Sequence, residues 1–261
     1  QAFTITVTNA NEAPTGVSLS ASSIAENAAG ASVGTLSTAD PDSGDTFSYS
    51  LSGTDADSFE IAGTTLKLEA SVTADYETKV SYAVTVTATD SGSLSTSQAF
   101  TVTVTNVNEA PSGVSLSASS IAENAAGATV GTLSSTDPDS GDSVTYSVSG
   151  TDAASFEVSG TTFKLKSGVS ADYETQSSYA VTVTATDSGG LTASQAFTVT
   201  VTDVNEAASI TLSNTTVAEN SSGASVGTVT VSDPDAGDTF SYSLSGTDAD
   251  SFEVSGSTVK L

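Results

Sequence analysis

Apolar residues alternate with polar ones in short runs along most of the chain. Tyr82, Val84 and Val86 share one parity, with threonines between them, and Phe100 and Val102 repeat the pattern. A period of two places apolar side chains on one face of a β-strand, and no run shows the 3.6-residue period of a helix. About seven such runs, separated by turn-forming residues, predict an antiparallel β-sandwich or barrel.

The pattern repeats along the chain with a period of 97 residues. Gln1 is matched by Gln98 and Gln195, and Glu26 is matched by Glu123. From Glu219 the offset falls to 96, because one residue is lost shortly before it. A unit of this length can bury its own core, so each repeat is predicted to be one self-contained domain.

The ends of the chain do not coincide with the predicted domain boundaries. Residues 1–12 match the last strand and linker of a preceding repeat, and two full repeats follow at 13–109 and 110–206. Residues 207–261 begin a third repeat without the counterparts of its last two strands, so we expect an open sheet edge and low order there. The chain has no methionine, and we expect it to be a piece of a longer array.

Composition excludes several classes of function. The net charge is −26, from 31 acidic residues against 5 lysines, so nucleic acid and anionic membranes are not expected partners. Without cysteine or histidine there are no disulfides, thiolate metal sites or Ser-His-Asp triads. Asp75 and Glu77 are not expected to act as a glycosidase pair, and no catalysis is predicted. The remaining carboxylates, amides and hydroxyls are hard oxygen ligands, which suit calcium or magnesium.

The acidic residues recur at fixed places, each in a loop, a turn or a strand end. In the first repeat they are Glu26, Asp40, Asp42, Asp75, Glu77, Asp90 and the linker residue Glu109. Two carboxylates about 4 Å apart repel by roughly 4 kcal/mol at an effective dielectric constant near 20. We call each end of a sandwich, where its loops meet, a pole. A pole at which several carboxylates lie close together is expected to bind a cation, and calcium accepts such oxygens from separate loops.

Five motifs in this order resemble cadherin repeats, in their bacterial cadherin-like form, over the whole chain. The family linker Asp-x-Asn-Asp-Asn-x-Pro is matched by Asn106–Pro111, shortened by one residue. The other four motifs are matched by Glu26-Asn27 (Glu-Asn), Asp75-Tyr76-Glu77 (Asp-Arg-Glu), Asp40/Asp42 (Asp-x-Asp) and Asp90 (Ala-x-Asp), with their equivalents in later repeats. The resemblance implies tandem Greek-key, immunoglobulin-like β-sandwiches of about seven strands, arranged end to end as a rod.

The resemblance also implies calcium ligands divided across each junction. For the central junction they are Glu26, Asp75, Glu77, Asn106, the Val107 carbonyl, Asn108, Glu109, Asp137, Asp139 and Asp187. For the following junction they are Glu123, Asp172, Glu174, Asp203, Asn205, Glu206, Asp233 and Asp235. For the first linker they are Asn9, Asn11, Glu12, Asp40, Asp42 and Asp90.

The chain departs from the family pattern in three respects. Asn9 and Asn106 stand where the family linker begins with aspartate, and only Asp203 conforms. One charge fewer should weaken binding or lower the number of ions. Ala208 replaces the proline of the last linker, and tyrosine replaces the arginine of the Asp-Arg-Glu motif.

Asp-Pro-Asp-Ser-Gly-Asp, residues 40–45, has two interpretations. It resembles a continuous calcium loop, but its composition is also typical of a β-turn. For its last aspartate, and for the equivalent Asp142 and Asp238, we favour the turn.

The expected function is that of a calcium-rigidified extender in a large extracellular or cell-surface adhesin, secreted or attached to an outer membrane. Its expected partners are calcium ions at the junctions, neighbouring repeats and a homophilic or surface ligand. Two alternatives stay open: a carbohydrate- or ice-binding module that uses the threonine-rich strand faces, and an accessory region of a secreted enzyme.

Overall fold

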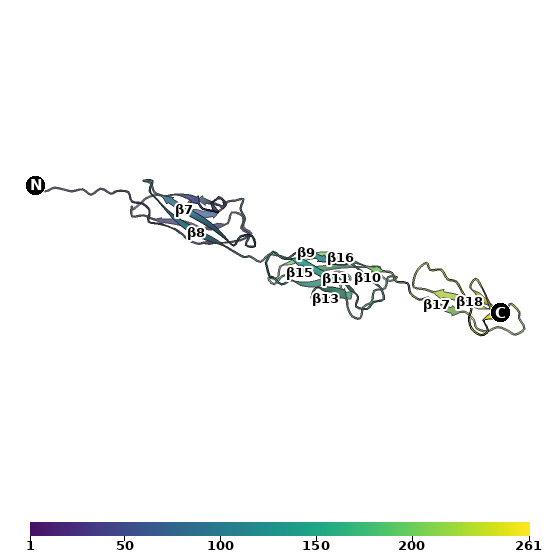
Figure 1. Cartoon of the computed structure of the whole chain (residues 1–261). Coiled ribbons are helices and arrows are strands. Elements are labelled where there is room, and N and C mark those ends of the chain that lie inside the picture. Colours follow the sequence, from purple (N-terminus) through teal and green to yellow (C-terminus); the bar gives the residue numbers. More distant parts are fainter. The chain divides into compact units, whose positions relative to one another are not determined.

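The computed structural model describes all residues from 1 to 261 and is all-β apart from three short 3₁₀ helices (Figure 1). The chain divides into two compact units. The first comprises residues 1–110 together with 137–142, and the second comprises residues 111–136 together with 143–261. No helix is long and apolar enough to cross a membrane.

The first unit contains a sandwich of two four-stranded sheets. Their orders are β1-β3-β6-β5 and β2-β8-β7-β4. The strands are β1 (Gly16–Leu19), β2 (Ser23–Ala25), β3 (Ser32–Ala39), β4 (Ser48–Ser52), β5 (Phe59–Ala62), β6 (Thr65–Leu68), β7 (Ser81–Thr89) and β8 (Ser95–Thr105), with the 3₁₀ helix η1 at Ala56–Ser58. β2 pairs with β8 in parallel and every other pair is antiparallel. The short β2, which begins a stretch without clear alternation, raises the predicted number of about seven strands to eight.

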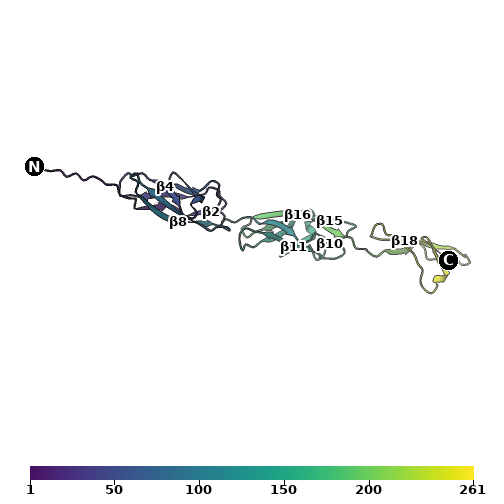
Figure 2. The same cartoon turned by 45° about the horizontal axis from the view of Figure 1, so that its top comes forward.

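The core of this sandwich is built by the alternation seen in the sequence. Tyr82, Val84, Val86 and Ala88 on β7 are all buried, and the residues between them are exposed or half-buried. β7 and β8 lie side by side along the sandwich (Figure 1), and β2, which pairs with the other edge of β8, is labelled beside it in Figure 2. Full burial of a valine or leucine side chain contributes about 1.5–3 kcal/mol, so this face holds the two sheets together.

The second sandwich repeats this architecture in the second unit. Its sheets have the orders β13-β14-β11-β9 and β10-β16-β15-β12. The strands are β9 (Ser112–Leu116), β10 (Ser120–Ala122), β11 (Thr129–Thr136), β12 (Thr145–Ser149), β13 (Phe156–Ser159), β14 (Thr162–Leu165), β15 (Ser178–Thr186) and β16 (Thr192–Thr202), with η2 at Ala153–Ser155. Phe163 stands where the first repeat has Leu66, and its ring stacks on Phe156 with centroids 4.9 Å apart.

Residues 207–261 form one sheet of the fold and not the other. The sheet has the order β17-β18-β20-β19, from β17 (Ser209–Leu212), β18 (Ser225–Ser232), β19 (Glu253–Ser255) and β20 (Thr258–Lys260), with η3 at Ala249–Ser251. The residues equivalent to β2 and β4 form no strands, because in complete repeats those strands pair only with β8 and β7. Leu244 is 40% exposed as a result, so the apolar face of this sheet is incompletely covered.

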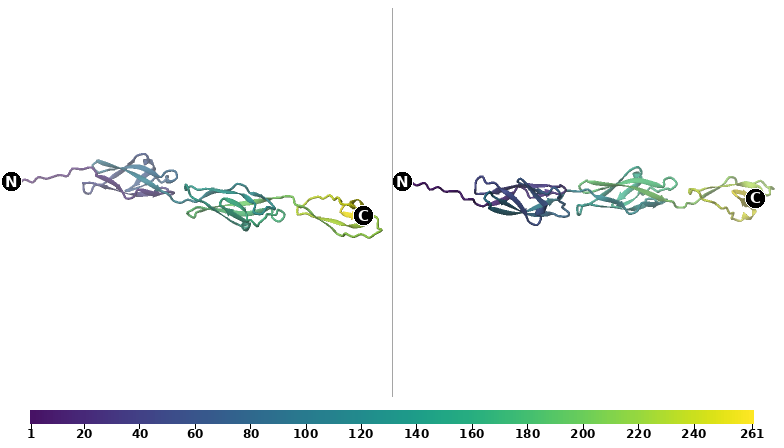
Figure 3. Two further views of the ribbon diagram at one scale, coloured as in Figure 1. Left: turned by 60° about the horizontal axis from the view of Figure 1, so that its bottom comes forward. Right: turned by 90° about the horizontal axis from the view of Figure 1, so that it is seen from above.

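Residues 1–12 are extended but belong to no sheet (Figures 1 and 3). Their sequence closely matches residues 98–109, which include most of β8 and the linker. β8 is paired on both sides, by β2 and β7, whereas no such strands flank residues 1–12 in this chain. Phe3, Ile5 and Val7 are therefore 86%, 87% and 91% exposed.

Candidate metal centre

Glu26 anchors the pole at which the first sandwich meets its linker. It follows β2 directly, and only 3% of its surface is exposed. Its Oε2 accepts a hydrogen bond from the backbone N–H of Tyr76 at 2.7 Å, and its Oε1 accepts one from the N–H of Val107 at 2.7 Å. A single buried carboxylate therefore fixes both the Asp-Tyr-Glu loop and the linker.

Asn27 makes a second hydrogen bond to the same linker. Its backbone has φ of 64°, in the left-handed region that asparagine tolerates better than most residues. Its Nδ2 donates to Oε1 of Glu109 at 2.7 Å, and the Glu109 N–H donates to Oδ2 of Asp139 at 2.7 Å. The hydrogen bond between Glu109 and Asp139 connects the loop 137–142 to the first compact unit.

Acidic side chains lie close together around these hydrogen bonds. Ligand oxygens of Glu26, Asp75 and Glu77 lie within 4.8 Å of one another, and so do those of Glu77, Glu109 and Asp139. Glu77 belongs to both groups. Desolvation raises the pKa of Glu77, and the negative charges of Glu26, Glu109 and Asp139 raise it further.

Three carboxylate oxygens in this region are buried without a hydrogen-bond partner. They are Oε2 of Glu109, Oδ2 of Asp137 and Oδ1 of Asp139. A buried anionic oxygen without a partner is costly, and it is stabilised when a cation binds it. These hard oxygen donors, supplied by several loops, fit a divalent cation such as calcium.

The first linker makes the equivalent contacts with the loop after β3. Asn9 donates its side-chain amide to Oδ1 of Asp42, and the Glu12 N–H donates to Oδ2 of Asp42 at 2.7 Å. These two donors, with the Glu12 N–H the stronger, hold the pKa of Asp42 below its usual range. Asn11 donates to Oδ2 of Asp90 at 3.0 Å, and Asp90 is 6% exposed.

The third linker, residues 203–208 after β16, makes equivalent contacts within the second unit. Glu123 accepts from the N–H groups of Tyr173 and Val204, both at 2.7 Å, and the Glu206 N–H donates to Asp235 at 2.7 Å. Oε2 of Glu206 is again buried without a partner. The acids Glu123, Glu174 and Asp203 gather within 4.8 Å.

Negatively charged carboxylates also lie close together at the third linker. Desolvation, followed by the charges of Glu123, Glu206 and Asp203, raises the pKa of Glu174. Desolvation also raises the pKa of Asp203, and the charge of Asp235 adds to it.

The other predicted residues also make hydrogen bonds or lie in the linkers. Asp187 follows β15 and accepts from the Leu191 N–H at 2.8 Å, as Asp90 does from the Leu94 N–H. Asp172 accepts from Thr175, and Asp233 accepts from the Asp235 N–H. Asn106, Val107, Asn108 and Asn205 lie in linker segments that form no strand.

Asp45 is not among the predicted ligands, yet it lies close to two of them. The carboxylate of Asp45 lies within 4.8 Å of those of Asp40 and Asp42. Its signal in the sequence is the resemblance of residues 40–45 to a calcium loop, although their composition favours a turn.

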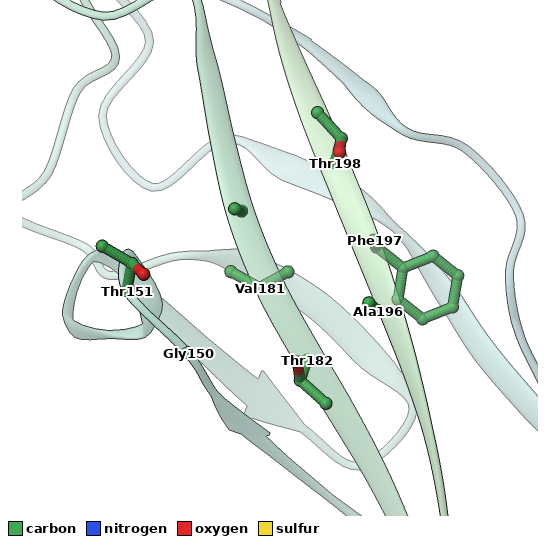
Figure 4. A pocket seen from close by; sticks show the side chains of 8 residues that line it. Gly150, Thr151, Val181, Thr182, Ala196, Phe197 and Thr198 are labelled. Carbon is green, nitrogen blue, oxygen red and sulfur yellow. The ribbon is translucent and has the colours of Figure 1, made fainter.

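A shallow pocket of about 240 Å³ lies beside β15 and β16 (Figure 4). Gly150, Thr151, Thr182 and Thr198 line it together with Ala180, Val181, Ala196 and Phe197. Phe197 is half-buried and packs against the core, so its ring does not stand out as a platform for a sugar. No charged group lines this pocket, and it offers no ligand set comparable with the acidic poles.

The comparisons with known proteins identify the repeats. A family model described as the cadherin domain matches residues 20–105 and 117–202, together more than half of the chain. The chain belongs to the cadherin family. The human cadherin-related family member 2 is 31% identical over 191 residues, which cover 66% of this chain and 15% of that protein.

Solved cadherin structures share the fold. The cis-dimer structure of protocadherin gammaB7 EC3-6 is 26% identical, with a TM-score of 0.59, and the match covers 87% of this chain and 57% of that one. Mouse cadherin-23 EC22-24 is 24% identical, with a TM-score of 0.65, covering 92% and 84%. Cadherin domains are adhesion modules and not enzymes, as the sequence analysis expected of this segment.

The chain spans only a small part of its curated relative and little more than half of the protocadherin structure. Two of these relatives are human and mouse proteins, and the bacterial form of the family stays a prediction.

Proposed function

We propose that these cadherin repeats bind calcium at their linkers and act as a calcium-stiffened extender of an extracellular or cell-surface adhesin. The buried, unpartnered oxygens of Glu109, Asp137 and Asp139 carry this proposal. They are anionic, belong to the linker and to the loop that contacts it, and have the chemistry that calcium prefers.

The residues proposed as ligands divide into three roles. Glu26, Asp75 and Glu77 supply carboxylates from the end of one repeat, and Asn106, Val107, Asn108 and Glu109 supply linker oxygens. Asp137, Asp139 and Asp187 supply carboxylates from the repeat that follows. At the other two linkers we propose Asn9, Asn11, Glu12, Asp40, Asp42, Asp90, Glu123, Asp172, Glu174, Asp203, Asn205, Glu206, Asp233 and Asp235.

Bound calcium would neutralise the acids that otherwise repel one another and would connect groups from both sides of each linker. Without it, the crowded carboxylates favour conformations that separate them. Ions that bind only the ordered linker stabilise it as their concentration rises. Extracellular calcium modules typically have dissociation constants of about 10⁻⁴–10⁻³ M, so a calcium-rich medium outside cells would keep the linkers ordered.

Adhesion itself rests on the family, and its partner would be a second copy or a surface ligand. No observation favours the carbohydrate- or ice-binding alternative over this one. The outward residues of β7 are Ser81, Ala83, Thr85, Thr87 and Thr89, without an aromatic ring, and Thr87 is paired with Ser97 at 2.8 Å.

Small-angle X-ray scattering of the whole chain in calcium and then in EGTA tests the proposal. We expect a defined, extended particle in calcium and a more flexible one in EGTA. Asp139→Asn should shift the calcium profile toward the EGTA profile, whereas Asp57→Asn, an exposed acid in η1, should not. Identical profiles in calcium and EGTA, together with no heat of calcium binding by calorimetry, would refute the proposal.

A further inference from the structure

The loop between β3 and β4 folds three aspartates of one short segment onto one another. Ligand oxygens of Asp40, Asp42 and Asp45 lie within 4.8 Å of one another. Gly44 lies between the last two. Its backbone φ is 93°, a value that residues with a Cβ rarely adopt. The glycine therefore lets the chain reverse and return Asp45 to the other two acids.

The hydrogen bonds of this loop leave two carboxylate oxygens without partners. Both oxygens of Asp42 are taken by the first linker, and Oδ1 of Asp40 accepts from the Asp42 N–H at 2.8 Å. Oδ1 of Asp45 accepts from the hydroxyl of Ser91 at 2.6 Å. Oδ2 of Asp40 and Oδ2 of Asp45 are each buried, with less than 1 Å² exposed and no partner.

A β-turn alone does not explain why these two oxygens are buried without partners. A turn aspartate normally directs its carboxylate to nearby backbone N–H groups or to water. Here the Asp45 carboxylate is oriented by Ser91 so that its second oxygen is removed from solvent among other acids, where an unpartnered charge is unfavourable. The arrangement makes sense when a cation completes it.

We propose that Asp45 is a further calcium ligand at this pole, and that Ser91 positions its carboxylate. The inference rests on the proposed function, because it assumes that the pole binds calcium. Asp142 and Asp238 have the same place in their repeats, after Gly141 with φ of 90° and Gly237 with φ of 105°.

This ligand offsets the charge that the linker lacks. Asn9 stands where the family linker has aspartate, so the ligand set inferred from the family carries one negative charge fewer. Asp45 supplies a carboxylate to the same pole, whose other acids the linker contacts through Asn9 and Glu12. Since calcium affinity depends on the number of charged ligands, Asp45 keeps the site competent despite the asparagine.

The test compares Asp45→Asn with the unaltered whole chain. The amide is nearly the same size and can still accept from Ser91, so the turn is retained. Two-dimensional NMR during a calcium titration would follow the backbone signals of residues 40–45 and, separately, those of residues 106–110. We expect Asp45→Asn to weaken calcium binding at residues 40–45 at least about tenfold and to leave binding at residues 106–110 unchanged. Asp57→Asn is the matched control and should alter neither.

Thermal unfolding in EGTA separates a ligand from a merely structural residue. If Asp45 is a ligand, removing its buried charge should raise the calcium-free melting temperature by a few degrees and reduce the gain on adding calcium. A lower melting temperature in EGTA with unchanged calcium binding would identify a structural turn and overturn the inference.

The two proposals fail in different ways. If calcium perturbs neither segment of the unaltered chain, the proposed function fails and this inference fails with it. If calcium binds at residues 106–110 and Asp45→Asn leaves binding at residues 40–45 unchanged, only the role of Asp45 is wrong.

Discussion

Asn27 and Glu109 are 82 positions apart in the sequence, yet the Asn27 side-chain amide donates to the Glu109 carboxylate at 2.7 Å. The contact joins the residue after β2 and Glu26 to the linker after β8. It holds Oε1 of Glu109 and leaves Oε2 buried without a partner. The linker is therefore oriented by a neutral donor, and one oxygen of its acidic side chain remains without a partner.

Substitution of Asn27 separates its backbone role from its side-chain role. Asn27→Gly keeps the left-handed conformation and loses only the hydrogen bond, so we expect the first repeat to lose about 1 kcal/mol of unfolding free energy. Asn27→Ala adds the strain of the left-handed region, about 1–2 kcal/mol more. Hydrogen exchange of β2 and β8 amides in EGTA would measure both. Equal protection in Asn27→Gly and the unaltered chain would show that the contact contributes nothing.

Asp139→Asn should have opposite effects with and without calcium. Asp139 is 8% exposed, and its Oδ1 has no partner, so the neutral amide removes a buried uncompensated charge. In EGTA we expect about 1 kcal/mol of added stability around residues 106–110, and in calcium a net loss. Calorimetric melting in both buffers would measure this, with Asp57→Asn as the control. A loss of the same size in both buffers would contradict a role in cation binding.

Asp55 should make the stability of the first repeat sensitive to acid. The hydrogen bond from Lys79, followed by that from the Ala83 N–H, lowers the pKa of Asp55 below its ordinary value of 3.8. Because the folded pKa lies below the unfolded one, this contribution to stability is present above pH 3.8 and is lost as the pH falls through the folded pKa. The second repeat has Gln176 in place of Lys79, donating to Asp152 at 3.1 Å.

Carboxyl carbon NMR titration measures this directly. The Asp55 pKa should rise toward its ordinary value in Lys79→Gln, which copies the second repeat. An unchanged Asp55 pKa in that variant would show that the lysine does not hold the carboxylate.

The core of the second repeat should be sensitive to the loss of its additional ring. Phe163 is fully buried and stacks on Phe156, whereas the first repeat has the smaller Leu66 at the same place. Phe163→Leu should lower the stability of the second sandwich by about 1–3 kcal/mol, since it removes a ring contact and leaves space behind. Hydrogen exchange at β14 and β15 would show it, with β6 and β7 unaffected. A change of equal size in both repeats would contradict a local packing effect.

Much of the fold can be read from local pattern. The alternation at Tyr82, Val84 and Val86 predicts a strand with one buried face, and the structure buries that face. The 97-residue period predicts equal sandwiches, and the acids at strand ends predict acidic poles. These features follow from the chain itself, because a period of two and a turn composition depend only on neighbouring residues.

Other features depend on residues far apart in the sequence. The parallel pairing of β2 with β8 involves Ile24 and Val104, and β2 has too few residues to show any alternation. Likewise, the equivalent of β4 in residues 207–261 keeps its alternating sequence but forms no strand without its neighbour. Strand formation there needs backbone partners that the local sequence does not supply.

The acidic poles show the same division. Composition and position identify Glu26, Asp42 and Glu109 as candidates for a cation site, but they do not indicate which oxygens are already occupied. Backbone donors from distant loops occupy both oxygens of Glu26, and Ser91 holds one oxygen of Asp45. The unpartnered oxygens are what remains after those long-range hydrogen bonds form, so they emerge only when the loops come together in the folded chain.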